Sequence, residues 1–551
     1  MKSINFYSPK ILLFLLILVF IDYIIGMLMI DLMEVDTMQY GSIAWEMLDS
    51  GNFLQVQHRH LDYLDKPPLL FWLSSLSFSI FGFSPFSFRI PSFFFTVLGA
   101  FSTYKLAKLY YNKETGILAA VILTSSQAWF LMNHDPRTDN ILAGAVIFGV
   151  WQVVLYLRYN KPLNFFLGFL GIALAMLEKG PIGLMVPVLA IGSELLYKRD
   201  WKNLFKWQWI GAAAFILVLL SPMIWGLFKQ FGWEGVKFYF WTQSFGRITG
   251  ESVWKDSSGY LFFVHTFLWT FLPWMILALY GIGIKFSEIF KSGKTGKYEI
   301  LSLAGFLLPF IALSFSHFKL PHYIFVGFPF IAIVTAHGIQ KVLSNEKESE
   351  KKILFFIQLF INLVLWVGIA FICIKVFPLN NLLIIFIAVI LLILSMYFSL
   401  RSTSLKFDIL IPSTLTIIAV NFLLNIHFYP ELLTYQSGTY IARYASENQI
   451  PAEKMYIYEK SSHSLDFYLK SIVPIVEDQE DIQQVLNDQG SIWIVTNNKG
   501  KKLIDELYDS PLTIEEFKDF HITLLSSRFL NPETRSSVVR TRYLIRLDSP
   551  E

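Results

Sequence analysis

The residues best suited to chemistry lie in a polar segment, residues 33–68, between two hydrophobic spans. The segment begins near a carboxylate, Asp36, and ends with Asp65-Lys66-Pro67-Pro68. Apolar residues follow Asp36 at helical spacing, which predicts a helix with one apolar face resting on the membrane surface. Pro67-Pro68 is typical of the start of a second, short helix. A carboxylate held at a helix start is oriented, and an oriented carboxylate is suited to general-base catalysis.

Both charged residues also have interpretations that involve no chemistry. Asp36 and Gln39 have the spacing of a capping box, in which the carboxylate satisfies backbone N–H groups of its own helix. For Lys66 the alternative is a lysine that extends its ammonium group to the membrane interface, the commonest use of lysine there. For Asp36 the two interpretations are compatible, because a capping carboxylate is also an oriented one.

A second acidic and basic cluster occupies residues 133–140, at the mouth of a predicted helix. Arg137 and Asp139 are its main candidates for a cavity or a site. Asp135 and Asp139 suggest a divalent metal site, but a proline lies between them and no histidine pair or third carboxylate accompanies them. The alternative is that Asp139 caps the helix that follows it.

Three further clusters interrupt the apolar sequence. Lys179 lies in Glu178-Lys179-Gly180-Pro181, which a tight Gly-Pro turn alone would explain. Arg247 lies in an aromatic-rich stretch, where it either frames a cavity or binds lipid headgroups. Residues 314–323 bring together Lys319, His322 and Tyr323, a set that can neutralise and hydrogen-bond a phosphate. The alternative for this last set is an aromatic and basic belt at the membrane interface.

The composition indicates a polytopic membrane protein. Of the 551 residues, 54% are hydrophobic, 17% are aromatic and only 16% are charged. A net charge of +3 without a basic run argues against nucleic acid as a partner. A single cysteine, Cys373, excludes an internal disulfide framework.

The apolar runs predict a mainly α fold, a membrane bundle of about thirteen helices. Interfacial helices are expected in the first external loop, residues 31–90. The predicted runs are 11–30, 91–109, 115–131, 140–157, 163–177, 181–197, 207–228, 260–284, 299–316, 321–340, 353–376, 380–400 and 408–427.

Charge predicts the orientation of the bundle. Alternate loops carry nearly all the lysine and arginine, and such loops are cytoplasmic by the positive-inside rule. With the amino terminus inside, the loop at 31–90 and the clusters containing Asp139, Lys179, Arg247 and Lys319 fall on the outer face. We therefore expect a multi-pass protein of the cell (inner) membrane with its site on the periplasmic or extracytoplasmic side.

The composition changes after residue 428, which predicts a transmembrane domain over 1–428 and a small soluble α/β domain over 429–551. Strands are predicted at 455–458, 491–495 and 538–545, and helices near 463–470, 480–488 and 500–508. This domain has no Gly-rich phosphate loop, no CxxC and no plausible catalytic triad. It is expected on the outer face because the predicted number of helices is odd.

Several of these motifs resemble one family of proteins. The order D-x-x-x-Y from Asp36, then W-E-M-L-x-S-G-x-F, then D-K-P-P-L-x-x-W resembles the first external loop of the aminoarabinose (lipid A) transferase and protein O-mannosyltransferase superfamily, glycosyltransferase family 39-like proteins of fold C. Arg137-x-Asp139 resembles the R-x-D form of that superfamily, and residues 314–323 resemble its S-x-S-K-x-x-K-L-P-x-Y element. The resemblance covers roughly residues 10–340.

The resemblance implies roles for the residues named above. Asp36 maps onto the catalytic carboxylate of the family. Binding of the donor phosphate or lipid is implied for Lys66, Arg247, Lys319 and Tyr323. A second acidic element and other cavity positions are implied for Asp65, Arg137, Asp139, Lys179 and His322. The family's aminoarabinose branch often carries a histidine in the stretch that corresponds to 254–260, and this chain has none there. The resemblance therefore assigns no metal ligands to this chain.

The function implied is that of an integral-membrane glycosyltransferase. It would move a sugar from a polyprenyl (undecaprenyl) phosphate donor to an envelope lipid or glycan acceptor such as lipid A, by an inverting single displacement with Asp36 as general base. No cofactor is certain, and a divalent metal stays an alternative. The other candidate functions are a protein O-mannosyltransferase-like enzyme and a non-enzymatic transporter or flippase of lipid-linked sugars. A transporter predicts ionisable residues buried within spans, and Asp22 is one such residue.

Overall fold

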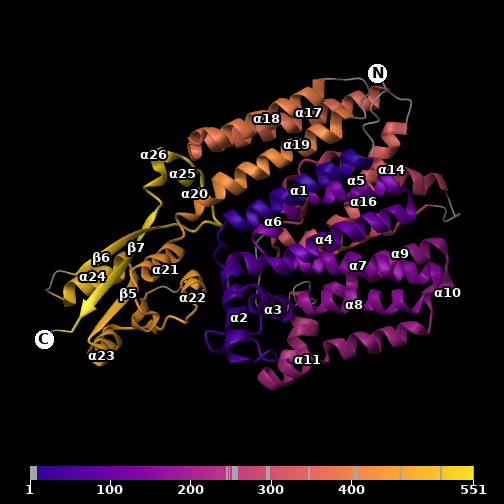
Figure 1. The fold of residues 1–551 in the computed structure, drawn as a ribbon. Coiled ribbons are helices and arrows are strands. Elements are labelled where there is room, and N and C mark those ends of the chain that lie inside the picture. Colours follow the sequence, from indigo (N-terminus) through magenta and orange to yellow (C-terminus); the bar gives the residue numbers. More distant parts are fainter. Residues whose placement is uncertain are drawn as a thin grey trace.

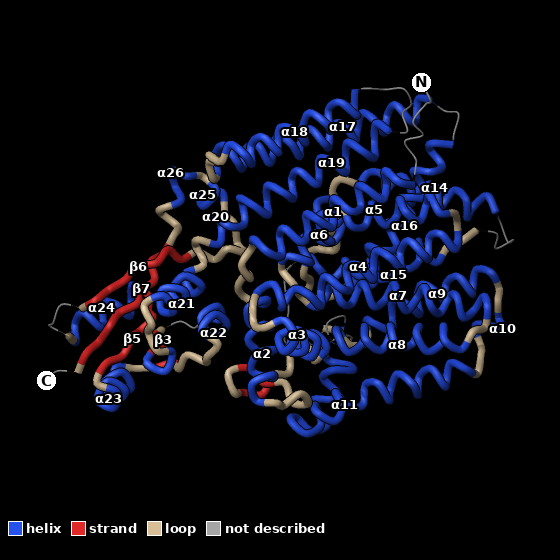
Figure 2. The backbone as a smooth tube through the Cα atoms, in the orientation of Figure 1, coloured by secondary structure: helices blue, strands red, loops and turns tan. Residues whose placement is uncertain are grey.

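The computed structural model describes residues 9–243, 246, 249–250, 258–292, 298–344, 348–400, 407–459, 462–508 and 512–549. Figure 1 shows a large bundle of roughly parallel helices with a smaller region of strands and helices at one end. The strands of that region form one sheet near the carboxyl terminus, and almost all the rest of the molecule is helical (Figure 2). The predicted class, a mainly α membrane bundle with a small carboxyl-terminal domain containing a sheet, is confirmed.

Each of the thirteen predicted apolar runs is helical. The helices that correspond to them are α1 (Pro9–Met29), α4 (Pro85–Tyr110), α5 (Lys113–Thr124), α6 (Gln127–His134), α7 (Thr138–Tyr159), α8 (Pro162–Lys179), α9 (Ile182–Lys198), α11 (Gln208–Lys237), α13 (Phe262–Thr270), α14 (Met275–Ser292), α15 (Leu301–Ser314), η3 (Pro321–Gly327), α16 (Phe328–Ser344), α17 (Glu348–Phe371), η4 (Ile372–Val376), α18 (Leu382–Leu400), α19 (Phe407–Leu423) and η5 (Leu424–Phe428). A short helix, α10 (Trp201–Leu204), and a π-helix, η1 (Phe238–Thr242), flank α11.

Fewer spans meet the length and hydropathy criteria than the thirteen predicted. In the described part of the chain, eight helices are long and apolar enough to cross a membrane, or up to ten if each of two bent pairs is one span. The bent pairs are α5 with α6, at 55°, and α13 with α14, at 116°. Helices α9 and α15 fall short because they contain only 17 and 14 residues. The protein is a multi-pass membrane protein, as predicted.

The first loop, residues 31–90, forms a compact unit that carries the proposed catalytic carboxylate. It contains α2 (Asp36–Ser50), a two-residue hairpin of β1 (Gln57–His58) and β2 (Leu61–Asp62), and α3 (Leu69–Phe81). Both predicted helices are therefore present and begin where the sequence places them. The apolar face of α2 is buried against protein, however, since Tyr40, Ile43, Ala44 and Met47 belong to the main hydrophobic core.

The carboxyl-terminal region folds around a five-stranded mixed sheet of order β4-β3-β5-β7-β6. Strand β3 pairs in parallel with β4 and β5, whereas β7 is antiparallel to β5 and β6. The strands are β3 (Met455–Tyr458), β4 (Ile475–Val476), β5 (Ser491–Asn497), β6 (Thr513–Asp519) and β7 (Arg540–Asp548). The helices of this region are α20 (Tyr429–Leu433), α21 (Ser437–Glu447), η6 (Ala452–Lys454), α22 (His463–Leu469), α23 (Gln479–Gln489), α24 (Asn498–Leu507), α25 (Ser527–Leu530) and α26 (Pro532–Arg535).

The carboxyl-terminal region packs directly on the first loop through α22, next to α2 in Figure 1. Arg59 of the loop donates a hydrogen bond to the carboxylate of Asp466, and Glu34 accepts hydrogen bonds from the Ser464 backbone N–H and hydroxyl at 2.9 and 2.6 Å. Gly41 of α2 permits close packing, because a Cβ there would lie 2.6 Å from the ring of Phe467. The loop bearing Asp36 is thus held between the bundle and α22.

Candidate active site

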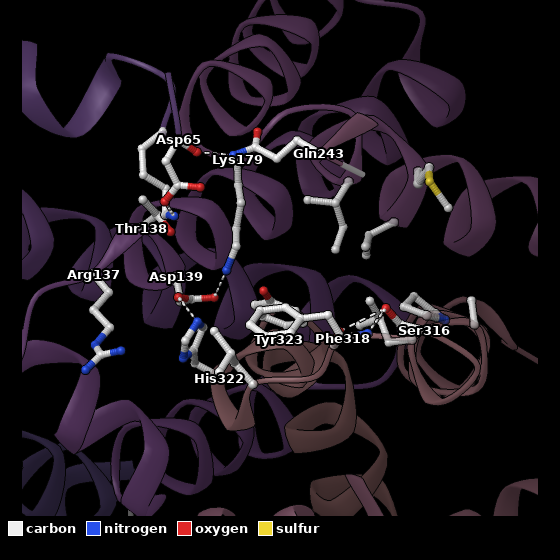
Figure 3. A pocket seen from close by; sticks show the side chains of 18 of the residues that line it. Asp65, Arg137, Thr138, Asp139, Lys179, Gln243, Ser316, Phe318, His322 and Tyr323 are labelled. Atoms are coloured by element: carbon white, nitrogen blue, oxygen red, sulfur yellow. Dashed lines mark hydrogen bonds and ion pairs between the residues drawn. The ribbon is translucent and has the colours of Figure 1, made fainter. Parts of the chain in front are cut away.

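A cavity of about 290 Å³ lies where the first loop meets the ends of several bundle helices. Figure 3 shows its charged side chains gathered at one end. The polar lining includes Asp36, Tyr40, Asp65, Lys66, Arg137, Thr138, Asp139, Lys179, Gln243, His322 and Tyr323. The apolar lining comes largely from α9 and α15, with Ile182, Met185, Val186, Leu189, Pro309, Ala312 and Leu313. The cavity therefore joins a charged end to an apolar trough between membrane helices.

Asp36 is the first residue of α2, and its carboxylate is turned to an ion pair rather than to a helix cap. The N-cap residue is Val35, and no side chain makes a capping hydrogen bond. Asp36 Oδ2 instead accepts a hydrogen bond from Arg137 Nη1 at 2.7 Å, and Gln39 Nε2 lies 3.4 Å from His58 Nδ1. The capping-box alternative is therefore wrong. The Asp36 side chain keeps 39% of its surface exposed, so a substrate can reach it.

Arg137 connects two carboxylates at this end of the cavity. Its Nε donates to Asp135 Oδ2 at 2.9 Å while Nη1 donates to Asp36. Asp135 also accepts a hydrogen bond from the Thr37 hydroxyl. Although burial lowers the pKa of Arg137, the charges of Asp135 and Asp36 outweigh that effect and raise it above its ordinary value. The guanidinium is therefore a fixed positive charge beside Asp36.

Asp139 and Lys179 form a second ion pair in the cavity wall, with Lys179 Nζ 2.6 Å from Asp139 Oδ1. The Asp139 side chain is only 2% exposed, and His322 Nε2 lies 3.9 Å from its other oxygen. Figure 3 shows Lys179 and His322 approaching Asp139 from two sides. Lys179 also lies 4.8 Å from the centre of the Tyr323 ring. Helix α7 begins at Thr138 with Arg137 as its N-cap residue, so the alternative interpretation, in which Asp139 caps this helix, is wrong.

Lys66 and Asp65 form the third ion pair of the cavity. The Lys66 side chain is 19% exposed and lines the cavity, which does not fit a lysine extended into the interface. Gln243 of the segment after η1 donates a hydrogen bond to the backbone carbonyl of Asp65 (Figure 3). This contact links the Asp65-Lys66 segment to the far end of α11.

Lys319 is buried beside the cavity but is not part of its lining. Its Nζ donates to the Ser258 carbonyl at 2.9 Å and lies 5.9 Å from the Tyr260 ring. Arg247 lies outside the described residues. Of the predicted site residues, the structure thus gathers Asp36, Asp65, Lys66, Arg137, Asp139, Lys179, His322 and Tyr323 around one cavity and places Lys319 at its margin.

Sequence reasoning missed three contributors to this site. Thr37 and Gln243 support the charged groups through hydrogen bonds, and the apolar wall of α9 and α15 extends the cavity into the bundle. Gln243 lies in the same aromatic-rich stretch as Arg247, so its position was a usable signal. In the part of the chain that the structure describes, no group of three or more histidine, cysteine or acidic side chains is placed to hold a metal ion.

Residues 65–225 match the family model described as dolichyl-phosphate-mannose-protein mannosyltransferase. A protein of Aquifex aeolicus with no assigned function is 31% identical over 338 residues, which cover 60% of this chain and 73% of that protein. The chain belongs to the dolichyl-phosphate-mannose-protein mannosyltransferase family. The undecaprenyl phosphate-alpha-4-amino-4-deoxy-L-arabinose arabinosyl transferase of Shewanella sediminis is 26% identical over 343 residues.

The match to that transferase covers 60% of this chain and 60% of the relative's length. The family resemblance in fold extends further than the sequence match. The crystal structure of ArnT from Cupriavidus metallidurans bound to undecaprenyl phosphate superposes with a TM-score of 0.74 at 16% identity, over 99% of this chain and 100% of the other. The apo form of the same protein gives a TM-score of 0.72. Nearly the whole chain therefore has the fold of that protein.

Proposed function

We propose that this family member is an integral-membrane glycosyltransferase that uses a polyprenyl-phosphate sugar as donor. The observation that carries the proposal is the cavity itself, in which three ion pairs line one end and the apolar side chains of α9 and α15 line the other. A polyprenyl-phosphate sugar has the same division, with a charged phosphate and sugar attached to a long apolar chain. We assign the chain undecaprenyl phosphate as its donor lipid, on the donor named for the arabinosyl transferase relatives.

The proposed reaction is an inverting single displacement. An acceptor hydroxyl loses its proton to Asp36, and its oxygen forms a bond to the anomeric carbon of the sugar. The bond from that carbon to the phosphate oxygen breaks, and the polyprenyl phosphate leaves with the electron pair. General-base assistance of this kind contributes about 10²–10⁴-fold to the rate.

The contacts of Asp36 fit the role of base. Among the described residues, Arg137 donates its hydrogen bond to the Oδ2 atom of Asp36 and not to Oδ1. Asp36 itself lines the cavity and is partly exposed. Arg137 therefore fixes the carboxylate in place while an acceptor can approach its other oxygen.

The donor phosphate is proposed to bind by exchange of ion-pair partners. Lys66 and Lys179 each pair with a carboxylate within the cavity wall. A phosphate entering this end competes with those carboxylates for the two ammonium groups, and charge-assisted hydrogen bonds to phosphate are among the stronger contacts available there. Lys319, Arg247 and Tyr323 are proposed to complete the phosphate and lipid site.

The side and the acceptor are also proposals. The positive-inside pattern supports an extracytoplasmic cavity, with residues 429–551 as a separate domain on the same side of a bundle formed by 1–428. The helical stretch Ile409–Leu433 runs a few residues past that boundary. For the acceptor we propose an envelope lipid or glycan such as lipid A.

A comparison of glycolipid mass profiles tests this function. Cells with the wild-type protein, cells without it and cells with Asp36→Asn are compared. The proposal predicts a glycolipid species, heavier by one sugar, that is present only with the wild-type protein. If the profiles are identical while undecaprenyl-phosphate sugars change sides of the membrane, the protein is a flippase and not a transferase. If the added sugar appears on a protein instead, the acceptor is that of an O-mannosyltransferase-like enzyme.

A further inference from the structure

Arg89 is a completely buried arginine whose described hydrogen bonds all go to backbone carbonyls. It lies near the start of α4. Its Nη1 donates to the carbonyls of Met27 and Ile30 at 3.3 and 2.7 Å, and its Nη2 donates to that of Asp31 at 2.9 Å. Its Nε donates to the carbonyl of His134 at 3.0 Å.

These carbonyls belong to the carboxyl ends of two different helices. Met27 lies in the last turn of α1, with Ile30 and Asp31 just beyond it, and His134 is the last residue of α6. The last carbonyls of a helix have no partner within the helix and carry its partial negative charge. A single cation that binds both ends therefore fixes the point at which each chain leaves its helix.

The two segments that leave these ends carry the charged pair of the proposed active site. Asp36 follows the α1 end after the segment 32–35, and Arg137 follows the α6 end after Asp135 and Pro136. The two side chains then meet at 2.7 Å. The ends of α1 and α6, which Arg89 anchors, thus lie a few residues before Asp36 and Arg137, whose distance from each other sets the geometry of the proposed base.

We propose that Arg89 is a positioning residue for catalysis. By binding the ends of α1 and α6, it fixes the segments bearing Asp36 and Arg137 relative to each other. This inference rests on the proposed function of Asp36 as base. Arg89 does not touch the cavity, so its effect on the reaction passes through the backbone of the two segments. Misplacement of a catalytic group by about 1 Å can cost about 10²-fold in rate.

The geometry requires arginine rather than a cation in general. The guanidinium is planar and presents several N–H groups in a fixed fork, whereas a lysine ammonium is a compact point charge. Arg89 uses all three nitrogens, and they reach both helix ends at once. A lysine at this position keeps the buried charge but cannot bridge the two ends in the same way.

The test compares Arg89→Lys with a matched control, Arg158→Lys. Arg158 also donates to a helix-end carbonyl, that of Leu109 at 3.0 Å, but it lies at the opposite end of α7 from the cavity. Purified variants are given membrane lipid extracted from cells that lack the protein, which supplies donor and acceptor. The initial rate of glycolipid formation and the Kd for undecaprenyl phosphate are measured together with thermal unfolding.

We expect Arg89→Lys to lose about 100-fold in rate with the Kd for undecaprenyl phosphate changed less than about threefold. Arg158→Lys should match the wild type. In an Arg137→Ala background, Arg89→Lys should cost less than about threefold more, because the two residues act through the same geometry.

Other outcomes overturn the proposal in distinguishable ways. If the wild-type protein is active and Arg89→Lys transfers the sugar at the same rate, positioning by Arg89 is refuted and the proposed function stands. An inactive wild type refutes the proposed function itself. If Arg89→Lys lowers the rate, the affinity for undecaprenyl phosphate and the amount of folded protein together, Arg89 is a structural residue only. The same holds if the rate losses of Arg89→Lys and Arg137→Ala multiply in the double variant. If Arg89→Lys does not fold, Arg89→Gln is measured, and failure of both to fold has the same meaning.

Discussion

Replacement of Lys66 by methionine tests the phosphate site most sharply. The substitution keeps an unbranched side chain as far as the Cε atom but removes the ammonium group that lines the cavity beside Asp65. A hydrogen bond that involves a charged group contributes about 1.5–3 kcal/mol, so its loss corresponds to about 10–100-fold in Kd for undecaprenyl phosphate. Asp65 also loses its partner and then repels the phosphate, which places the expected effect toward the upper end of that range.

The assay is binding of undecaprenyl phosphate to purified protein in lipid nanodiscs. Lys229→Met is the matched control, because Lys229 is an exposed lysine on α11 that lies 4.9 Å from the Trp225 ring and is not part of the cavity. The control should bind as the wild type does. Asp65→Asn should bind the phosphate more tightly, since it releases Lys66 from its ion pair. Equal affinity in the wild type and Lys66→Met would refute a phosphate-binding role for Lys66.

Three further predictions concern stability, pH and sidedness. Lys179→Met removes the lysine of the ion pair with the buried Asp139 carboxylate and should lower the free energy of unfolding by about 3–5 kcal/mol. The double variant with Asp139→Asn should recover most of that loss. Equal melting temperatures for the two variants contradict this. Burial, followed by the charge of His463, lowers the pKa of His58 to about 4. As the pH drops from about 6.5 toward 4, the unfolded state therefore binds a proton before the folded state does, and the free energy of unfolding should fall by about 1 kcal/mol after allowance for partial exposure. The fall should be smaller in His58→Gln. A reporter fused after Glu551 should be active only outside the cytoplasm, and cytoplasmic activity would invert every assigned loop.

The local features of the site were predictable from sequence because they depend on short spacing. The helix at Asp36, the helix after Pro67-Pro68 and the thirteen helical runs all follow from apolar periodicity and proline placement. Such patterns involve residues within a few turns of one another. The phosphate role of Lys66 is instead implied by the resemblance of Asp65-Lys66-Pro67-Pro68 to the family's loop.

The contacts that organise the site were not predictable in this way. Arg137 reaches Asp36 across 101 positions, and Arg59 reaches Asp466 across 407 positions. No single-sequence pattern encodes which helix ends meet. The apolar face of α2 was expected to face lipid, but it packs into the protein core because α3 and α22, the latter from the carboxyl-terminal region, both lie against α2.

The sheet shows the same limit on a smaller scale. Strands β3, β5 and β7 contain apolar runs or alternation and were predicted, whereas the two-residue strand β4 was missed and so was the longer β6. Its sequence Thr-Ile-Glu-Glu-Phe-Lys-Asp is largely charged, and it is an edge strand that pairs only with β7. Edge strands commonly carry charge, so hydrophobicity alone does not find them.

The measurement that tests the central claim most directly is transfer by Asp36→Asn beside its binding of undecaprenyl phosphate. The substitution keeps the shape of the side chain and its hydrogen bond with Arg137 but removes the base. We predict that glycolipid formation falls by about 10²-fold or more, while the protein remains folded and its Kd for undecaprenyl phosphate stays within about threefold of the wild type. Transfer at the wild-type rate by Asp36→Asn would contradict the assignment of Asp36 and with it the proposed mechanism.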